Sequence, residues 1–229
     1  MTTERGTQGK GPPSAITLAA SIVTHILLLL PVVYIVVLAF VHYQFFSWHP
    51  ICMSIAVGLL ISEAVFSISG EAYLSYRLPR RYRVTVHWIL NSLGLGFLAI
   101  GFIIIVVNKV NQEKSHFVTT HSQLGLTTLI ITALVSAFGI LANNTNWLYP
   151  KVRPVLIKVS HAFAGIFLTI LLLATLINGT YTRWWPGGEV GRDLTFASLF
   201  FAGLFILIKP ILGAVSRTKV ILNPPSSQT

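Results

Sequence analysis

Residues 86–107, VHWILNSLGLGFLAIGFIIIVV, carry no Asp, Glu, Lys or Arg and are long enough to cross a bilayer as a helix, which takes about 20 apolar residues. Five further stretches have the same apolar character with few charges: residues 17–41, 48–69, 121–142, 157–179 and 194–216. Short polar segments separate them, so consecutive helices must run in opposite directions. The sequence therefore predicts an all-α membrane protein with six transmembrane helices.

The composition excludes a water-soluble enzyme. The 229 residues are 54% hydrophobic and 10% charged, with a mean hydropathy of +0.75, whereas soluble domains carry about 25% charged residues. The 16 Lys and Arg against 6 Asp and Glu indicate loop charges that flank membrane spans, and we expect no nucleic-acid partner. The single cysteine, Cys52, excludes a disulfide framework and a cysteine-based metal site.

The basic residues predict the orientation, because Lys and Arg stay on the cytoplasmic side of short loops. One side collects Arg5, Lys10, Arg77, Arg80, Arg81, Arg83, Lys151, Arg153, Lys158, Arg217 and Lys219. The other side has only Lys109, Lys114, Arg183 and Arg192. We therefore expect a disordered cytoplasmic tail at residues 1–16, a six-helix domain at 17–216 and a second cytoplasmic tail at 217–229.

Four of the seven histidines, His49, His87, His121 and His161, lie near the starts of spans two to five. Because the spans alternate in direction, His49 and His121 belong to the non-cytoplasmic face and His87 and His161 to the cytoplasmic face. In an up-down bundle of spans two to five, each pair comes from diagonally opposite helices. This arrangement suits a flat macrocycle with an imidazole on each side of its iron. The sequence predicts a four-helix bundle around two bis-histidine haems.

Small residues support this interpretation, since Gly125 and Gly165 lie one turn after His121 and His161 and leave room for a porphyrin. Three alternatives stay open. The histidines can be interfacial or form interhelical hydrogen bonds. They can belong to a cofactor-free transporter or proton relay, although the bundle spans are mainly apolar between the two histidine layers. The chain can also be a scaffold subunit for other membrane proteins.

Four segments resemble the cytochrome b561 family of transmembrane ascorbate-dependent reductases, and the chain is most similar to its short, domain-only branch. They are FSWHPICM (46–53), RRYRVTVHW (80–88), HFVTTHSQLG (116–125) and KVSHAFAG (158–165), in the order and spacing of the family. The resemblance spans roughly residues 17–216. It implies two b-type haems, one ligated by His49 and His121 and one by His87 and His161, in agreement with the pairing above.

The resemblance also implies a function. An enzyme of this family transfers electrons from cytoplasmic ascorbate through the two haems to monodehydroascorbate or a ferric chelate on the other side. By this analogy Arg80, Arg81 and Arg83 bind ascorbate and His116 lines the acceptor site. Gln123 stands where many members have a tryptophan, which alters the shape of the acceptor pocket. The short branch implies the endoplasmic reticulum or vesicles rather than the plasma membrane, with a homodimer as an open alternative.

Other polar and aromatic residues in the spans have structural or open roles. Glu63 lies 14 residues after His49 and about 21 Å deeper at 1.5 Å per residue. It can hydrogen-bond a haem-ligating histidine or serve a structural role. His25, outside the four-helix bundle, is expected to form an interhelical hydrogen bond. Trp184 and Trp185 are expected to belong to an interfacial aromatic belt.

Overall fold

The computed structural model describes residues 13–70 and 72–222. Within these residues it contains no strand and has six helical segments long and apolar enough to span a membrane, which confirms the predicted fold class. The helices are α1 (Ala15–Val41), α2 (Trp48–Ser54), α3 (Ser62–Ile68), α4 (Arg80–Asn111), α5 (Thr120–Asn143), α6 (Pro154–Gly179) and α7 (Gly188–Leu222). Residues 1–12 and 223–229, which include the predicted tail positions Arg5 and Lys10, lie outside the described residues.

The second span is not one regular helix. It runs from a 3-10 turn, η1 (Phe45–Ser47), through α2 and a π-helical segment, η2 (Ile55–Ile61), into α3. The hydroxyl of Ser62 donates a hydrogen bond of 2.7 Å to the carbonyl of Val57, which lies in this π-helical segment. The π segment changes the phase of the helix, so sequence spacing alone does not predict which way the residues of α3 face.

Two of the helices extend well beyond their apolar stretches. The long helix α4 begins at Arg80 rather than near residue 86, and α7 continues through Leu222, into the segment expected to be a tail. Apolar residues mark the thickness of the hydrocarbon layer, but a helix continues past it when the next residues form helices well. Arg and Lys are among the good helix formers.

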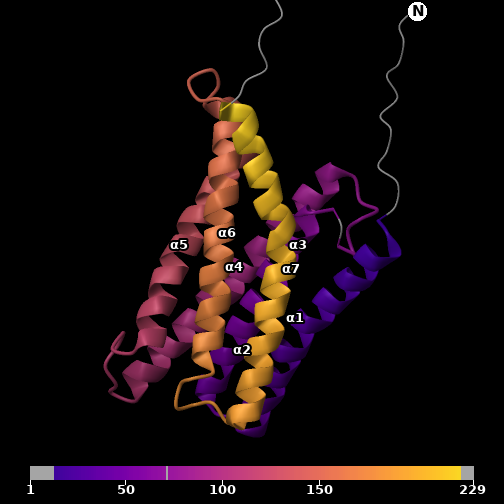
Figure 1. Ribbon diagram of the computed structural model, residues 1–229. Helices are drawn as coiled ribbons and strands as arrows, with labels where there is room; N and C mark the ends of the chain where they lie inside the picture. The colour runs from indigo at the N-terminus through magenta and orange to yellow at the C-terminus, as the bar shows by residue number, and fades with distance from the viewer. Residues whose placement is uncertain (1–12, 71, 223–229) are drawn as a thin grey trace, which may run out of the picture.

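The six spans alternate in direction, and α1 ends at the end of the molecule where α7 begins (Figure 1). The second span packs against α4, and α5 packs against α6. α7 lies between α6 and α1 on the outer side of this arrangement. A short 3-10 turn, η3 (Thr145–Trp147), belongs to the connection between α5 and α6. Spans two to five therefore form two antiparallel helix pairs that carry the four histidines.

Small residues let the helices approach closely where they cross. A side chain on Gly58 of η2 would meet Val32 of α1, and one on Gly203 of α7 would meet Leu173 of α6. Close packing of this kind drives helix association in lipid, where the hydrophobic effect offers little. The buried apolar core lies between α1, the second span, α6 and α7 and includes Leu28, Leu168, Leu172, Leu199 and Ile206.

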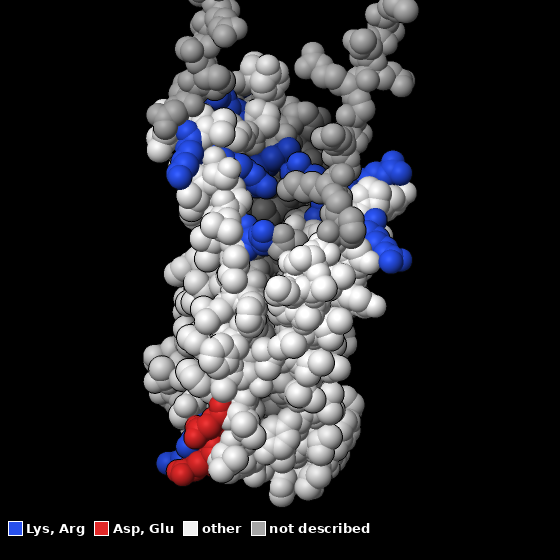
Figure 2. All heavy atoms as spheres, turned by 45° about the vertical axis from the view of Figure 1, so that its right-hand side comes forward, with Lys and Arg blue, Asp and Glu red and all other residues white. Residues whose placement is uncertain are grey.

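The charged residues are unevenly distributed over the two ends. Figure 2 shows Lys and Arg gathered at the upper end, where α4 and α6 begin and α7 ends. The acidic residues visible in that view lie at the opposite end. The long middle of the molecule exposes large apolar side chains, such as Leu134 on α5 and Leu204 on α7, as a lipid-facing surface requires.

A hydrogen-bonded histidine–glutamate pair joins the first two spans. His25 Nδ1 lies 2.7 Å from Glu63 Oε1, and the two side chains are only 17% and 15% exposed. The interhelical hydrogen bond expected of His25 is confirmed. The idea that Glu63 hydrogen-bonds a haem-ligating histidine is wrong, because its carboxylate faces α1 and the ring of His87 uses the Ala64 carbonyl instead.

Glu63→Leu should destabilise the protein by about 3 kcal/mol, because removing one member of a buried pair leaves the other without its partner. The double variant His25→Leu/Glu63→Leu should recover most of this loss, since both polar groups are then gone. The measurement is the midpoint of thermal unfolding in detergent for both single variants and the double variant. A double variant as unstable as the sum of the single ones would show that the pair contributes no coupling energy.

Candidate functional site

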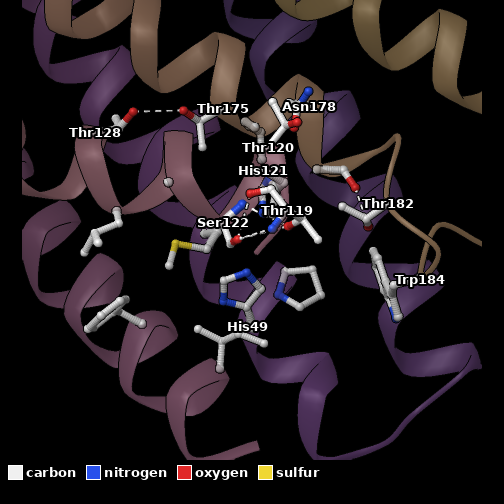
Figure 3. Close-up of a pocket in the computed structure, with 18 of the residues that line it drawn as sticks. His49, Thr119, Thr120, His121, Ser122, Thr128, Thr175, Asn178, Thr182 and Trp184 are labelled. Atoms are coloured by element: carbon white, nitrogen blue, oxygen red, sulfur yellow. Dashed lines mark hydrogen bonds between the residues drawn. The ribbon is translucent and has the colours of Figure 1, made fainter. Parts of the chain in front are cut away.

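His49 and His121 face a shared cavity at the end of the bundle opposite the one where most Lys and Arg residues gather. Their ring centroids are 6.3 Å apart and their planes lie at 82°. Both line a cavity of about 760 Å³, a size typical of small-molecule and cofactor sites. In Figure 3 the His49 ring lies within this cavity, with Thr119, His121 and Ser122 above it and Trp184 to one side. The predicted pairing of His49 with His121 therefore has the required proximity.

A capping box positions His121. Thr119, the N-cap of α5, accepts a hydrogen bond from the Ser122 amide over 3.2 Å, and its own amide donates to the Ser122 hydroxyl over 3.0 Å. These two bonds satisfy amide groups that the first turn of a helix otherwise leaves free. His121 sits between the two capping residues, so the cap fixes the direction in which its ring leaves the helix.

His87 on α4 and His161 on α6 lie at the other end of the same bundle. His87 is in the part of α4 that follows its start at Arg80, and His161 is two turns into α6. The Phe138 ring packs beside His161 with centroids 6.0 Å apart, and the Nδ1 atom of His161 is buried without a hydrogen-bond partner among the described residues. His87 and His161 thus lie at the same end of the bundle, and their pairing stays a prediction.

Two of the imidazoles are oriented by backbone carbonyls of the neighbouring helix. His49 Nδ1 lies 2.9 Å from the Gly101 oxygen on α4, and His87 Nδ1 lies 2.9 Å from the Ala64 oxygen on α3. A carbonyl only accepts hydrogen bonds, so in both rings Nδ1 donates and Nε2 keeps a free lone pair. Histidines that bind metals are commonly held in this way.

The other two imidazoles pack directly against glycines of the neighbouring helix. A Cβ on Gly179 of α6 would lie 3.2 Å from the Cε1 atom of His121, and a Cβ on Gly139 of α5 would lie 3.1 Å from that of His161. Each of these helices therefore receives the histidine of its neighbour against its own backbone. Any larger residue at position 139 or 179 would push the ring away.

The donor set fits a haem. The described residues contain no cluster of three or more His, Cys, Asp or Glu that could hold a metal ion, so a metal between two histidines needs its other ligands from elsewhere. A porphyrin supplies four. The separation of 6.3 Å between the ring centroids of His49 and His121 would leave room for one metal ion between the two rings.

Open space beside the histidines agrees with this fit. A Cβ on Gly165, one turn after His161, would meet no heavy atom within 4 Å, and one on Gly125, one turn after His121, would meet only Thr175, at 3.9 Å. Gly125 also lines the large cavity. The space predicted from these two glycines is present.

The model of the eukaryotic cytochrome b561 family matches residues 48–186, a range that includes both histidine pairs. The chain belongs to the cytochrome b561 family. It is 31% identical over 189 residues to the human transmembrane reductase CYB561D2, a match that covers 81% of this chain and 83% of that protein. It is 27% identical over 182 residues to the mouse plasma membrane ascorbate-dependent reductase CYBRD1, covering 71% and 59% of the two chains.

The mouse lysosomal membrane ascorbate-dependent ferrireductase CYB561A3 is 27% identical over 140 residues, which cover 58% of this chain and 54% of that protein. Cytochrome b561 proteins bind haem. Together with six apolar spans, family membership makes the chain a multi-pass membrane oxidoreductase that works by transmembrane electron transfer.

The three arginines at the start of α4 differ in their surroundings. Arg80 and Arg81 are exposed, and Arg81 is held against its neighbour Tyr82, with the guanidinium carbon 4.6 Å from the ring centroid and a 3.0 Å hydrogen bond to the hydroxyl. Arg83 is half-buried, and its guanidinium lies so close to Gly70 that a side chain there would collide with it. Its Nε atom is buried without a hydrogen-bond partner among the described residues.

His116 lines the cavity that contains His49 and His121. Trp184 and Trp185 also line it, and the Trp184 ring packs on Phe46, which in turn packs on His49. Assigning these two tryptophans only to an interfacial belt was therefore incomplete. Their position just after the fifth span, on the same side as His49, was the signal available in the sequence. Lys109 and Arg183, which also line the cavity, were missed as well.

Proposed function

We propose that this protein is an ascorbate-dependent transmembrane oxidoreductase with two b-type haems. His49 and His121 would hold one haem, and His87 and His161 would hold the other. Each haem, when bound, can accept and release one electron. The electron donor is ascorbate at the basic end, and the acceptor at the other end is monodehydroascorbate or a ferric chelate. The observation that carries the proposal is the His49–His121 pair, 6.3 Å apart inside the cavity.

Hydrogen bonds and burial at the proposed ligands favour the binding of iron. The Gly101 and Ala64 carbonyls hold the Nδ1 protons of His49 and His87, which makes Nε2 a better donor to a metal. Burial of the sites among apolar helices keeps water away and influences the redox potential. The names of the relatives CYBRD1 and CYB561A3 support ascorbate as the donor.

The orientation belongs to the proposal too. We assign the end rich in Lys and Arg to the cytoplasm, which places both termini there. The distribution of charge in Figure 2 supports this assignment, because the basic residues gather at the end where α4 and α6 begin. The resemblance to the short branch of the family favours an internal membrane such as the endoplasmic reticulum or vesicles.

The absorption spectrum of the purified protein tests the function. We expect a bound haem spectrum that changes from oxidised to reduced on addition of ascorbate, and that returns to the oxidised form on addition of ferric citrate. A correctly folded protein without haem would instead favour the proton relay or the scaffold. A haem protein that ascorbate does not reduce would exclude ascorbate as donor while leaving the haem assignment intact.

The donor site is proposed at Arg80, Arg81 and Arg83. Ascorbate is a monoanion at neutral pH, and guanidinium groups suit its paired oxygens. Arg83 supports the proposal most directly. The Nε–H of its guanidinium is buried and has no hydrogen-bond acceptor among the described residues. The alternative role of these arginines, enforcing topology or pairing with anionic lipid, is compatible with the exposed Arg80 and Arg81.

Arg81→Gln/Arg83→Gln should slow haem reduction at low ascorbate by roughly tenfold or more, since hydrogen bonds to charged groups contribute about 1.5–3 kcal/mol each. Raising the salt concentration should slow the wild type toward the variant, because exposed charge contacts are screened. Arg217→Gln on α7, at the same end, is the matched control for loss of charge. Equal reduction rates for the double variant and the wild type would leave topology as the role of these arginines.

A further inference from the structure

The connection between α4 and α5 turns back over the end of α4. The Lys114 amide donates to the Lys109 carbonyl over 2.9 Å and the Glu113 amide to the Val110 carbonyl over 3.1 Å, with Glu113 in the left-handed region at φ 54°. This is a Schellman motif, which glycine usually completes. We call residues 112–119 the rim loop, because they continue from this turn along the edge of the large cavity.

Two side chains, one from each flanking helix, hold the rim loop by its carbonyls. The Lys109 ammonium of α4 donates to the Ser115 oxygen over 2.6 Å. The Gln123 amide of α5 donates to the Phe117 oxygen over 3.1 Å. The loop is thus attached at two points to helices that are themselves fixed in the bundle.

Phe117 adopts a backbone conformation that its side chain disfavours. Its φ is 54°, in the left-handed region that glycine adopts freely and other residues rarely do. The ring stacks on Phe102 of α4, with centroids 6.4 Å apart and planes at 16°, and lies 5.8 Å from the His116 ring. A strained backbone persists only where its surroundings hold it, and here the stacking and the Gln123 bond do so.

The held residues form one wall of the site. Lys109, His116, Phe117 and Phe102 line the same cavity as His49 and His121, and Arg183 lines it from the connection before α7. Among the described residues no Asp or Glu lines this cavity. The Lys109 ammonium has three hydrogens and gives one to Ser115, so two can still be donated to a ligand. The entrance therefore suits an anion.

We infer that Gln123 is a positioning residue for an anionic electron acceptor: it holds the rim loop so that Lys109 and His116 are presented at the entrance of the cavity. This inference rests on the proposed function, which places the acceptor at this end.

Gln123→Ala tests the inference by two independent measurements in lipid nanodiscs, where both faces are accessible. Loss of one hydrogen bond should raise the rate of tryptic cleavage after Lys114 by roughly two- to tenfold. It should raise the KM for ferric citrate by a similar factor and leave kcat and the rate of haem reduction by ascorbate unchanged. Gln123→Glu, which has the same length but cannot donate when ionised, should raise the cleavage rate as Gln123→Ala does and raise the KM for ferric citrate at least as much, because its carboxylate also repels an anion.

The matched control is Thr127→Ala, one turn further along α5, whose hydroxyl bonds only to the Gln123 carbonyl within the helix. It should match the wild type in both measurements. Identical cleavage rates and identical KM values for Gln123→Ala and Thr127→Ala would overturn the inference. Cleavage is measured without an electron acceptor, so this result is separate from failure of the proposed function, in which the wild type itself would not reduce ferric citrate.

Phe117 provides a second pair of variants. Phe117→Ala removes the ring and keeps an unfavourable backbone conformation, whereas Phe117→Gly removes the ring but adopts φ 54° freely. If the shape of the rim loop matters, Phe117→Gly should stay closer to the wild type in tryptic cleavage and KM than Phe117→Ala. Equal defects in the two variants would assign the effect to the ring and not to the loop that Gln123 holds.

Discussion

His87→Ala and His161→Ala should each lower the haem content to about half and abolish rapid reduction by ascorbate, because one of the two proposed bis-histidine sites is lost. These two histidines lie at the basic end, where ascorbate is proposed to bind. The remaining haem, held by His49 and His121, should still be visible in the spectrum after chemical reduction with dithionite. The measurements are the haem-to-protein ratio and stopped-flow reduction by ascorbate.

His49→Ala and His121→Ala should also lose about half of the haem, but with the opposite functional result, since the site at the donor end stays complete. Reduction by ascorbate should remain and transfer to ferric citrate should fail. The two classes of variant therefore separate the donor half of the reaction from the acceptor half, which haem content alone cannot do.

His42→Ala is the matched control, because His42 is exposed in the connection between α1 and the second span and belongs to neither pair. It should retain full haem content and both half-reactions. Indistinguishable spectra and the same functional loss in His49→Ala and His87→Ala would show that the two-site assignment is wrong. Loss of all haem in every histidine variant would indicate instead that one site cannot fold without the other.

The proximity of His49 and His121 could be predicted because it depends on few physical facts. Apolar length fixes the number of spans, short connections fix their alternation, and position at the start of a span fixes the end at which a histidine lies. The proximity of His49 and His121 follows from these alone. The model of the family matches the part of the chain that contains all four histidines.

The partners of the imidazoles could not be predicted in the same way. The Ala64 carbonyl reaches His87, and Glu63 faces His25, beyond a π-helical segment that changes the phase of the second span. No residue pattern in the sequence predicts the π-helical segment. The conformation of the rim loop could not be predicted either. It depends on left-handed backbone conformations at Glu113 and Phe117, and neither residue is a glycine.

Glycines at the helix contacts give a test that leaves every proposed ligand in place. Gly179→Val should selectively remove the haem of the His49–His121 pair, because even a Cβ at position 179 would lie 3.2 Å from the His121 ring. Gly139→Val should remove the other haem, since a Cβ there would lie 3.1 Å from the His161 ring. Overpacking of a close contact costs about 1–3 kcal/mol, which corresponds to roughly a 5- to 150-fold loss of haem affinity at one site.

Gly213→Val on α7 is the matched control, because a Cβ at Gly213 would meet no heavy atom within 4 Å. Valine is at least as good a helix former as glycine, so a general loss of helix stability does not explain a defect at 139 or 179 alone. Gly179→Val should then fail in transfer to ferric citrate and keep reduction by ascorbate, whereas Gly139→Val should fail in reduction by ascorbate. Full haem content in both variants would mean that the imidazoles do not depend on their contacts with Gly139 and Gly179. His121 and His161 could then reach iron from a different ring position.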